Sequence, residues 1–151
     1  MAVRIQKEDF DVATELASMR LAGQGNVGAI VNFIGLVRDM NDGDAIQTLT
    51  LEHYPEMTEK ALEKIEAEAK ARWSVLESRI IHRVGRLQPQ DQIVLVAVSS
   101  AHRGDAFKAC EFMMDFLKTQ APFWKKETTN TGERWVEAKL SDDTAQSKWK
   151  L

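Results

Sequence analysis

Three short segments of the chain carry charged side chains that the surrounding residue pattern does not require. The first is residues 99–105, where an apolar strand pattern runs into a helix pattern and His102 and Arg103 stand at the junction. The first turn of a helix presents unpaired N–H groups and the positive end of the helix dipole, so basic residues there are consistent with an anion site. Asp105 is expected to cap the same helix. The alternative is a solvated arginine beside a histidine that is satisfied by a backbone carbonyl.

The second segment places two lysines on either side of a proline turn. Lys118 ends a helix pattern, where a lysine commonly complements the helix dipole. Lys125 lies just inside the following strand pattern, on one face with Phe123 and Glu127, whereas Lys126 belongs to the other face. Burial beside large aromatic rings lowers the pKa of a lysine towards a range that suits acid–base or nucleophilic chemistry. This segment is therefore a candidate for catalysis.

The third segment is the end of an apolar strand pattern, where Arg38 and Asp39 lead into a polar loop at residues 40–44. An Asp42-Gly43 pair within this loop is typical of a turn. Functional groups often project where a strand ends in a loop. A solvated Arg38–Asp39 ion pair is the alternative.

The remaining reactive residue types fit structural roles. Cys110 lies on the apolar stripe of its helix pattern, which predicts an inert core thiol and not a persulfide carrier. His53, His82 and His102 have no cysteine or paired carboxylates at ligand spacing, so neither a metal site nor a cofactor is expected. The sequence contains no phosphate-binding glycine motif in a strand–helix context and no nucleophile elbow.

The composition fits one domain spanning residues 1–151. The chain is 44% hydrophobic and 28% charged, values typical of a soluble globular protein. A net charge of −3 argues against nucleic acid or an anionic membrane as a partner, so anion recognition needs a local basic cluster. No apolar run reaches the roughly 18 residues of a membrane span, and the first ten residues do not resemble a signal peptide. A single cysteine favours a reducing, cytoplasmic location.

Periodicity predicts an alternation of strands and helices. Strands are expected at residues 3–6, 29–37, 46–54, 79–84, 93–99, 123–129 and 134–139, and helices at 11–21, 56–73 and 105–118. Residues 29–37 are predicted to be buried on both faces. Pro55 suits the first turn of its helix, and a hairpin is expected around Thr131-Gly132. This order favours an α+β fold with antiparallel pairing and helices packed on a sheet.

Taken together, these segments resemble the catalytic (large) subunit of molybdopterin synthase. The matching stretches are residues 31–38 (VNFIGLVR), 51–57 (LEHYPEM), 81–85 (IHRVG), 99–103 (SSAHR), 114–119 (MDFLKT), 121–127 (APFWKKE) and 134–137 (RWVE). Each stretch alone is a weak pattern, whereas their joint occurrence in this order is specific.

The resemblance implies an α+β fold of the α/β-hammerhead type with an additional antiparallel β subdomain. It implies a sulfurtransferase of molybdenum cofactor biosynthesis that inserts two dithiolene sulfurs into cyclic pyranopterin monophosphate. The sulfur is expected to arrive as a thiocarboxylate on the C-terminal Gly-Gly tail of a small ubiquitin-like subunit. Two large subunits would form a central homodimer, with one small subunit at each end of a heterotetramer.

The same resemblance assigns residues to the site. Lys118 and Lys125 are implied to be catalytic, and the channel for the partner's tail is implied to be lined by Phe33, Met114 and Phe123. The substrate pocket is implied to comprise Leu36, Val37, Arg38, His102, Arg103, Lys118, Lys125, Lys126, Glu127 and Lys139. Lys139 stands where arginine is frequent in the family, and in the family that basic residue comes from the dimer mate. Leu36 replaces a residue that is often polar or basic, and Gln90 stands where a turn glycine is usual.

Two other functions compete with this one. A non-catalytic module that binds a ubiquitin-like tail needs the apolar channel but not the lysines together with the anion pocket. An enzyme for a phosphate ligand on a ferredoxin-like fold rests on fold analogy alone.

Overall fold

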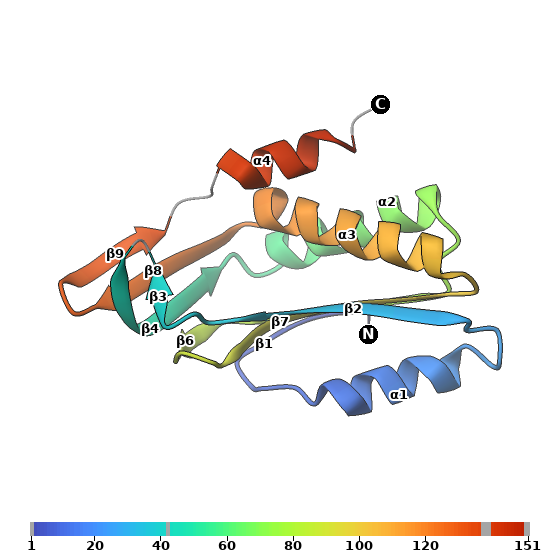
Figure 1. Ribbon diagram of the computed structural model, residues 1–151, viewed down its shortest axis with the longest axis horizontal. Coiled ribbons are helices and arrows are strands. Elements are labelled where there is room, and N and C mark those ends of the chain that lie inside the picture. Colours follow the sequence, from blue (N-terminus) through green and yellow to red (C-terminus); the bar gives the residue numbers. More distant parts are fainter. Residues whose placement is uncertain (1, 42, 137–139, 150–151) are drawn as a thin grey trace.

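The fold joins two β-sheets and the helices that cover them (Figure 1). The computed structural model describes residues 2–41, 43–136 and 140–149. Its strands are β1 (Val3–Gln6), β2 (Ala29–Leu36), β3 (Met40–Asn41), β4 (Asp44–His53), β5 (Glu77–Arg83), β6 (Gly85–Leu87), β7 (Gln92–Ser100), β8 (Phe123–Thr129) and β9 (Gly132–Val136). Its helices are α1 (Val12–Ala22), α2 (Met57–Arg72), α3 (Arg103–Gln120) and α4 (Leu140–Ser147).

The first sheet has the strand order β1-β5-β7-β2. β1 runs parallel to β5, and the other neighbours are antiparallel. Helices α2 and α3 cover one face of this sheet and α1 covers the other (Figure 1). Successive side chains of a strand point to opposite faces. Ile80 therefore joins the core beneath α2 and α3, whereas Ile81 joins the smaller core beneath α1.

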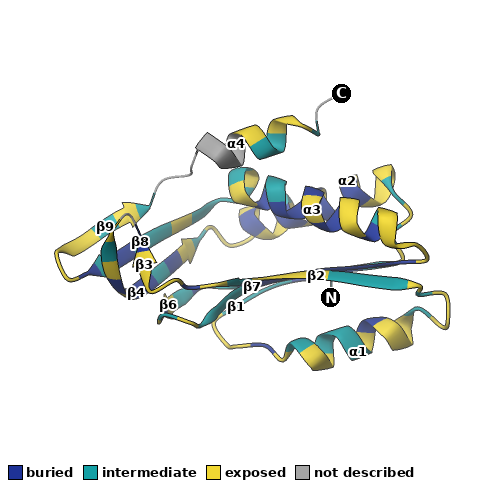
Figure 2. Ribbon diagram, in the orientation of Figure 1, coloured by how far each residue is buried: buried dark blue, intermediate teal, exposed yellow. Residues whose placement is uncertain are grey.

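The strand that is buried on both faces is β7, whose residues 94–100 are all buried. The sequence predicted this for residues 29–37, and that prediction is wrong. β2 is the last strand of the first sheet, and Figure 2 shows it as exposed or half-buried along most of its length. Phe33, Ile34 and Leu36 are 40%, 36% and 47% exposed. An apolar run has the same appearance in the sequence whether its strand is central or at an edge. Only the strand order separates the two cases.

The second sheet has the strand order β3-β4-β8-β9, and β6 also pairs with β4. All of its pairs are antiparallel. The predicted hairpin around Thr131-Gly132 is confirmed, since Thr129 pairs with Gly132. The φ of Gly132 is 125°, a backbone conformation that side chains rarely adopt. This sheet is the additional antiparallel subdomain that the resemblance implied.

The predicted helices are confirmed, and their ends differ from α1, α2 and α3 by at most two residues. Pro55 lies outside α2, because Glu56 occupies the N-cap position. Residues 40–41 form β3 instead of a loop, while Asp42 lies outside the described residues. The strand β6 was not predicted either. It is only three residues long, and it is a strand because it pairs with β4, which lies far away in the sequence.

Helix α4 was not predicted, because its sequence has no apolar stripe of its own. The segment is held by Trp149, which packs edge to face on Trp73 and Phe112. The indole N–H of Trp149 also donates to Asp115, at 2.6 Å. Long-range contacts therefore order this segment.

The described part of the chain contains neither a helix that could span a membrane nor a cluster of metal ligands. None of its helices combines the length and the apolar character needed to cross a membrane. Within the same residues, no group of three or more His, Cys, Asp or Glu side chains is placed to hold a metal ion.

Candidate active site

Lys118 and Lys125 lie on either side of the turn that connects α3 to β8. Lys118 is in the last turn of α3, and Lys125 is the third residue of β8. Both lysines lie within electrostatic range of one side chain, the imidazole of His82 in β5. The structure thus brings together the two lysines that the sequence singled out.

His82 forms the floor beneath this turn. Its imidazole is 2% exposed and stacks on the Phe123 ring, with ring centroids 3.7 Å apart and planes 15° apart. The Nδ1 atom lies 2.8 Å from the carbonyl oxygen of Arg83, to which it donates. The pKa of His82 is lowered to about 3, chiefly by burial and to a smaller extent by the nearby charges of Lys125 and Lys118, while the hydrogen bond to Arg83 acts in the opposite direction. The ring is therefore neutral. The sequence alone offered no signal for this role beyond the presence of a histidine in a strand.

A buried hydrogen-bond network supports the strand that carries Lys125. Arg38 donates through Nη2 to Oδ1 of Asn41, at 2.9 Å, and Nδ2 of Asn41 donates to Oε1 of Glu127, at 2.5 Å. Nε of Arg134 donates to the other oxygen of Glu127, at 3.0 Å, and Nη1 of Arg134 reaches Asp44, at 2.6 Å. Glu127 is 4% exposed and both of its oxygens are engaged. It acts as a structural link between strands, and Arg38 is tied to the same network.

Asn41 and Arg134 were not predicted as functional residues. The arginine belongs to a stretch that matched the family, but nothing in its spacing indicated a contact with Glu127. That contact depends on the register of the β8–β9 hairpin, in which the two residues are partners.

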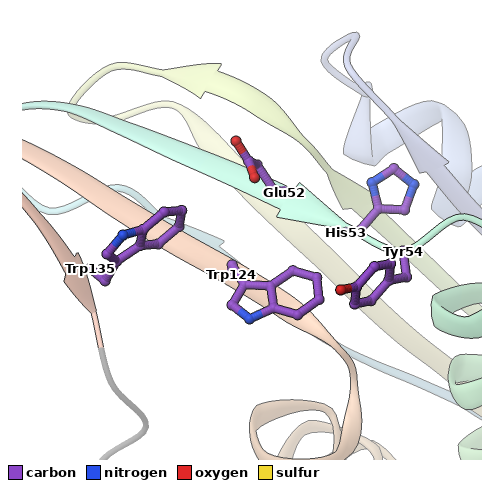
Figure 3. A pocket seen from close by; sticks show the side chains of 5 residues that line it. All are labelled: Glu52, His53, Tyr54, Trp124 and Trp135. Carbon is purple, nitrogen blue, oxygen red and sulfur yellow. The ribbon is translucent and has the colours of Figure 1, made fainter.

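Lys126 lies on the opposite face of the second sheet from Lys125, as the alternation of β8 predicted. Its ammonium is 3.6 Å from Glu133 and 5.6 Å from the centroid of the Trp135 ring, where it makes a cation–π contact. A pocket of about 530 Å³ opens there, lined by Glu52, His53, Tyr54, Trp124 and Trp135. Figure 3 shows the three aromatic side chains in a row. Tyr54 and Trp124 pack edge to face at 4.4 Å.

His102 and Arg103 lie at the opposite end of α3 from Lys118. An α-helix rises about 1.5 Å per residue, so the 15 residues between Arg103 and Lys118 correspond to roughly 22 Å. A single chain therefore does not bring them into one pocket. His102 occupies the N-cap position, and the prediction that Asp105 caps the helix is wrong. The Asp105 carboxylate instead accepts a hydrogen bond from the backbone N–H of Ser74, at 3.0 Å.

The remaining predicted residues occupy different environments. Val37 is buried in the core between the sheets, and its backbone pairs with Asp91 and Gln90. Leu36 and Phe33 are exposed on β2, whereas Met114 is buried in α3 against the first sheet. Lys139 lies outside the described residues.

Cys110 is an inert core thiol, as predicted. It is 4% exposed, and its Sγ is 3.7 Å from the carbonyl oxygen of Val96. Burial raises the pKa of the Cys110 thiol to about 12, so the reactive thiolate is not populated near neutral pH.

Fold and site together define an α+β protein with two lysines grouped around a buried, neutral imidazole. Known proteins match it closely. Residues 5–120 match the family model described as MoaE protein. The molybdopterin synthase catalytic subunit of Haemophilus influenzae is 56% identical over 147 residues, which cover 97% of each chain.

Solved structures share the fold. The molybdopterin biosynthesis MoaE protein of Burkholderia ambifaria is 55% identical, with a TM-score of 0.85, and the match covers 100% of this chain and 99% of that one. A complex of subunits 1 and 2 of the molybdopterin-converting factor of Helicobacter pylori contains a chain that is 23% identical, with a TM-score of 0.76. That match covers 91% of each chain and shows a shared fold alone.

This chain belongs to the MoaE family, the family of molybdopterin synthase catalytic subunits. The fold class and the enzymatic function that the resemblance implied are confirmed. A non-catalytic module is not favoured, because the curated relatives are named as catalytic subunits.

Proposed function

We propose that this chain inserts the two dithiolene sulfurs into cyclic pyranopterin monophosphate to form molybdopterin, with Lys118 and Lys125 as its catalytic residues. The sulfur is delivered by the C-terminal thiocarboxylate of a small ubiquitin-like subunit. The observation that carries this proposal is the placement of both lysines around His82 in a chain of this family. The name of the relatives, a catalytic subunit, also fits a second subunit as partner.

The chemistry of the substrates suits two lysines. A thiocarboxylate and a cyclic phosphate are both anions, and bringing them together requires fixed positive charge in a site with little water. Lysines also supply protons as oxygens leave the pterin side chain and sulfur enters. In the proposed arrangement Lys118 lies against the thiocarboxylate carbon and Lys125 acts mainly on the pterin.

A partner must supply the sulfur, because the chain's one cysteine is unsuited to carry it. The Cys110 thiol is buried and its pKa is raised to about 12. A persulfide carrier needs an accessible thiolate. The free thiol also fits the cytoplasm, a reducing compartment, as the proposed location.

The anion pocket is proposed to be shared between two copies of the chain. Arg38 belongs to the strand end beside β3, in the same chain as the lysines. His102 and Arg103 lie roughly 22 Å from Lys118 along α3, so a second copy contributes them to each pocket. This arrangement requires a central homodimer, which with two small subunits forms a heterotetramer. Lys139 of the second copy is the proposed additional cation.

The partner's tail is proposed to approach along Phe33 and Met114 towards Phe123. Phe33 is exposed on β2, Met114 is a buried member of the main core, and Phe123 stacks on His82. Leu36 and Val37 are proposed to line the substrate pocket beside Arg38. Glu127 contributes by holding β8 in place, and Lys126 only by its backbone, because its side chain lies on the other face.

Reconstitution tests the proposal. The purified chain is mixed with cyclic pyranopterin monophosphate and the small subunit, prepared either as the thiocarboxylate or as the plain carboxylate. Dithiolene product is expected only with the thiocarboxylate. The Cys110→Ala variant is expected to retain most of the activity. A folded but inactive Cys110→Ala variant would restore a persulfide mechanism and contradict delivery by the partner alone.

A further inference from the structure

Asn41 connects the exposed Arg38 to the interior of the second sheet. The Asn41 residue is 8% exposed, whereas the neighbouring Met40 is 49% exposed. Oδ1 of Asn41 accepts a hydrogen bond from Nη2 of Arg38, at 2.9 Å, and Nδ2 of Asn41 donates to Oε1 of Glu127, at 2.5 Å. The side-chain amide is therefore engaged at both ends, on one side by a surface cation and on the other by a buried carboxylate.

An amide suits both neighbours of this position. A guanidinium has N–H donors and no acceptor, so the partner of Arg38 must accept. The carboxylate of Glu127 accepts, so its partner must donate. Asparagine carries one group of each kind, and these two neighbours fix which end of the amide points to which. An aspartate at the same place would bring a second negative charge against Glu127.

The buried charge of Glu127 is compensated by Arg134 and not by Arg38. Nε of Arg134 donates to Oε2 of Glu127, at 3.0 Å, and Nη1 of Arg134 donates to Asp44, at 2.6 Å. Its third nitrogen, Nη2, donates to the backbone carbonyl oxygen of Asn41, at 2.8 Å. Arg134 thus neutralises the carboxylate and at the same time holds the backbone of Asn41 in β3.

Arg38 keeps its charge and most of its donors for a ligand. Among the described residues, its hydrogen bond is to the neutral amide of Asn41 and not to a carboxylate. A guanidinium has about five N–H donors, so the exposed side chain can still bind an anion through two of them at once. A side chain that is already held in place also loses less freedom when the anion binds.

We propose that Asn41 is a positioning residue, which holds the Arg38 guanidinium in place for the phosphate of the substrate without neutralising its charge. This inference rests on the proposed function, because it assumes that Arg38 binds that phosphate. Asn41 acts through Arg38 and does not itself touch the reacting atoms. Its removal should therefore weaken substrate binding more than it slows the chemical step.

The reconstituted reaction tests this split. Asn41→Ala is expected to raise the KM for cyclic pyranopterin monophosphate roughly threefold to tenfold, since ordering one long side chain costs affinity of this size. The kcat should stay within about twofold of the wild-type value. Met40→Ala, at the neighbouring exposed position of β3, is the matched control and should change neither constant. An unchanged KM in a folded Asn41→Ala chain would overturn the inference.

The nearly isosteric Asn41→Asp variant tests the need for a neutral anchor. Its carboxylate can still accept from Arg38, but it neutralises the guanidinium and repels Glu127. The KM should therefore rise at least as much as in Asn41→Ala, although the size of the side chain is kept. A wild-type KM in Asn41→Asp would show that the charge of the anchor does not matter, which would contradict the proposal.

A double-mutant cycle separates positioning from packing. If Asn41 acts through Arg38, Asn41→Ala should have little further effect on KM in a chain that already carries Arg38→Ala. Additive effects of the two substitutions would show that Asn41 supports the site independently of Arg38. That outcome would also overturn the inference.

A measurement on the wild-type chain covers the case in which the Asn41 variants do not fold. A guanidinium held through Nη2 rotates slowly about its Cζ–Nε bond, so the two Nη nitrogens of Arg38 should give separate ¹⁵N resonances. A single averaged resonance would contradict the proposal. Failure of the proposed function has a different signature, because the wild-type chain would then give no product while the Arg38 resonances would still show whether the side chain is held.

Discussion

Arg134 and Glu127 face each other across the β8–β9 hairpin, with Nε of the arginine 3.0 Å from Oε2 of the glutamate. The other oxygen of Glu127 accepts from Asn41 in β3, at 2.5 Å. One buried carboxylate therefore links three strands of the second sheet, two residues from Lys125. The lysine depends on this link for the position of its strand.

Removing that carboxylate should destabilise the fold. Glu127→Ala leaves Nε of Arg134 and the buried amide of Asn41 without their acceptor, although Arg134 keeps Asp44. Leaving a buried donor unsatisfied costs about 1–3 kcal/mol of unfolding free energy. Glu133→Ala is the matched control, because Glu133 lies on the same hairpin and makes only an exposed ion pair with Lys126. Its effect should stay below about 1 kcal/mol. Urea unfolding of both variants checks this, and equal, small effects would show that the network contributes little.

The lysine pair could be predicted from the sequence, but the groups that hold it could not. The α3 pattern, the Pro122 turn and the alternation of β8 were enough to place Lys118 and Lys125 on either side of one turn. The roles of His82 and Arg134 depend on a ring stack and a strand register between residues far apart in the chain. Periodicity carries no information about either contact.

His82 should make the fold sensitive to acid. Its pKa is lowered from 6.5 to about 3 in the folded chain, so between these values the unfolded chain binds a proton that the folded chain excludes. Its contribution is complete above the unfolded pKa and is lost as pH falls, by at most about 1.4 kcal/mol per pH unit. His82→Phe should remove this part of the dependence. Urea unfolding between about pH 7 and pH 4 measures it, and identical slopes for both proteins would contradict the assignment.

Gln90 adopts a backbone conformation that favours glycine. Its φ is 76°, and its N–H donates to the carbonyl of Val37 at 2.8 Å in the turn before β7. Gln90→Gly should therefore stabilise the chain by about 1 kcal/mol, whereas Gln90→Ala keeps the strain and should give no gain. The two urea midpoints decide the point. A destabilised glycine variant would mean that the Gln90 side chain contributes more than the strain costs.

One wrong prediction and one untested assignment have the same physical origin. Residues 29–37 looked buried because their side chains are apolar, but β2 is the last strand of its sheet and leaves several of them exposed. His102 and Arg103 were grouped with Lys118 by the resemblance, although one helix separates them. In both cases the residues can meet their partners only on a second chain. A single sequence does not reveal which residues meet between chains.

Mixed dimers test the shared pocket. A chain with Arg103→Ala keeps its lysines, and a chain with Lys118→Ala keeps its arginine. If each pocket uses the lysines of one copy and Arg103 of the other, a mixed dimer contains one intact pocket. Random exchange of two inactive variants should then restore about one quarter of the wild-type rate. No recovery after confirmed exchange would place Arg103 and Lys118 of the same chain in one pocket, and full activity of the Arg103→Ala variant alone would remove Arg103 from the site.

The most direct measurement is product formation by Lys118→Ala in the reconstituted reaction with the thiocarboxylated small subunit. The account predicts a loss of about a hundredfold or more, with binding of the small subunit nearly unchanged. Lys108→Ala, an exposed lysine of the same helix, should retain full activity. Normal turnover by Lys118→Ala would contradict the central claim that this lysine carries the chemistry.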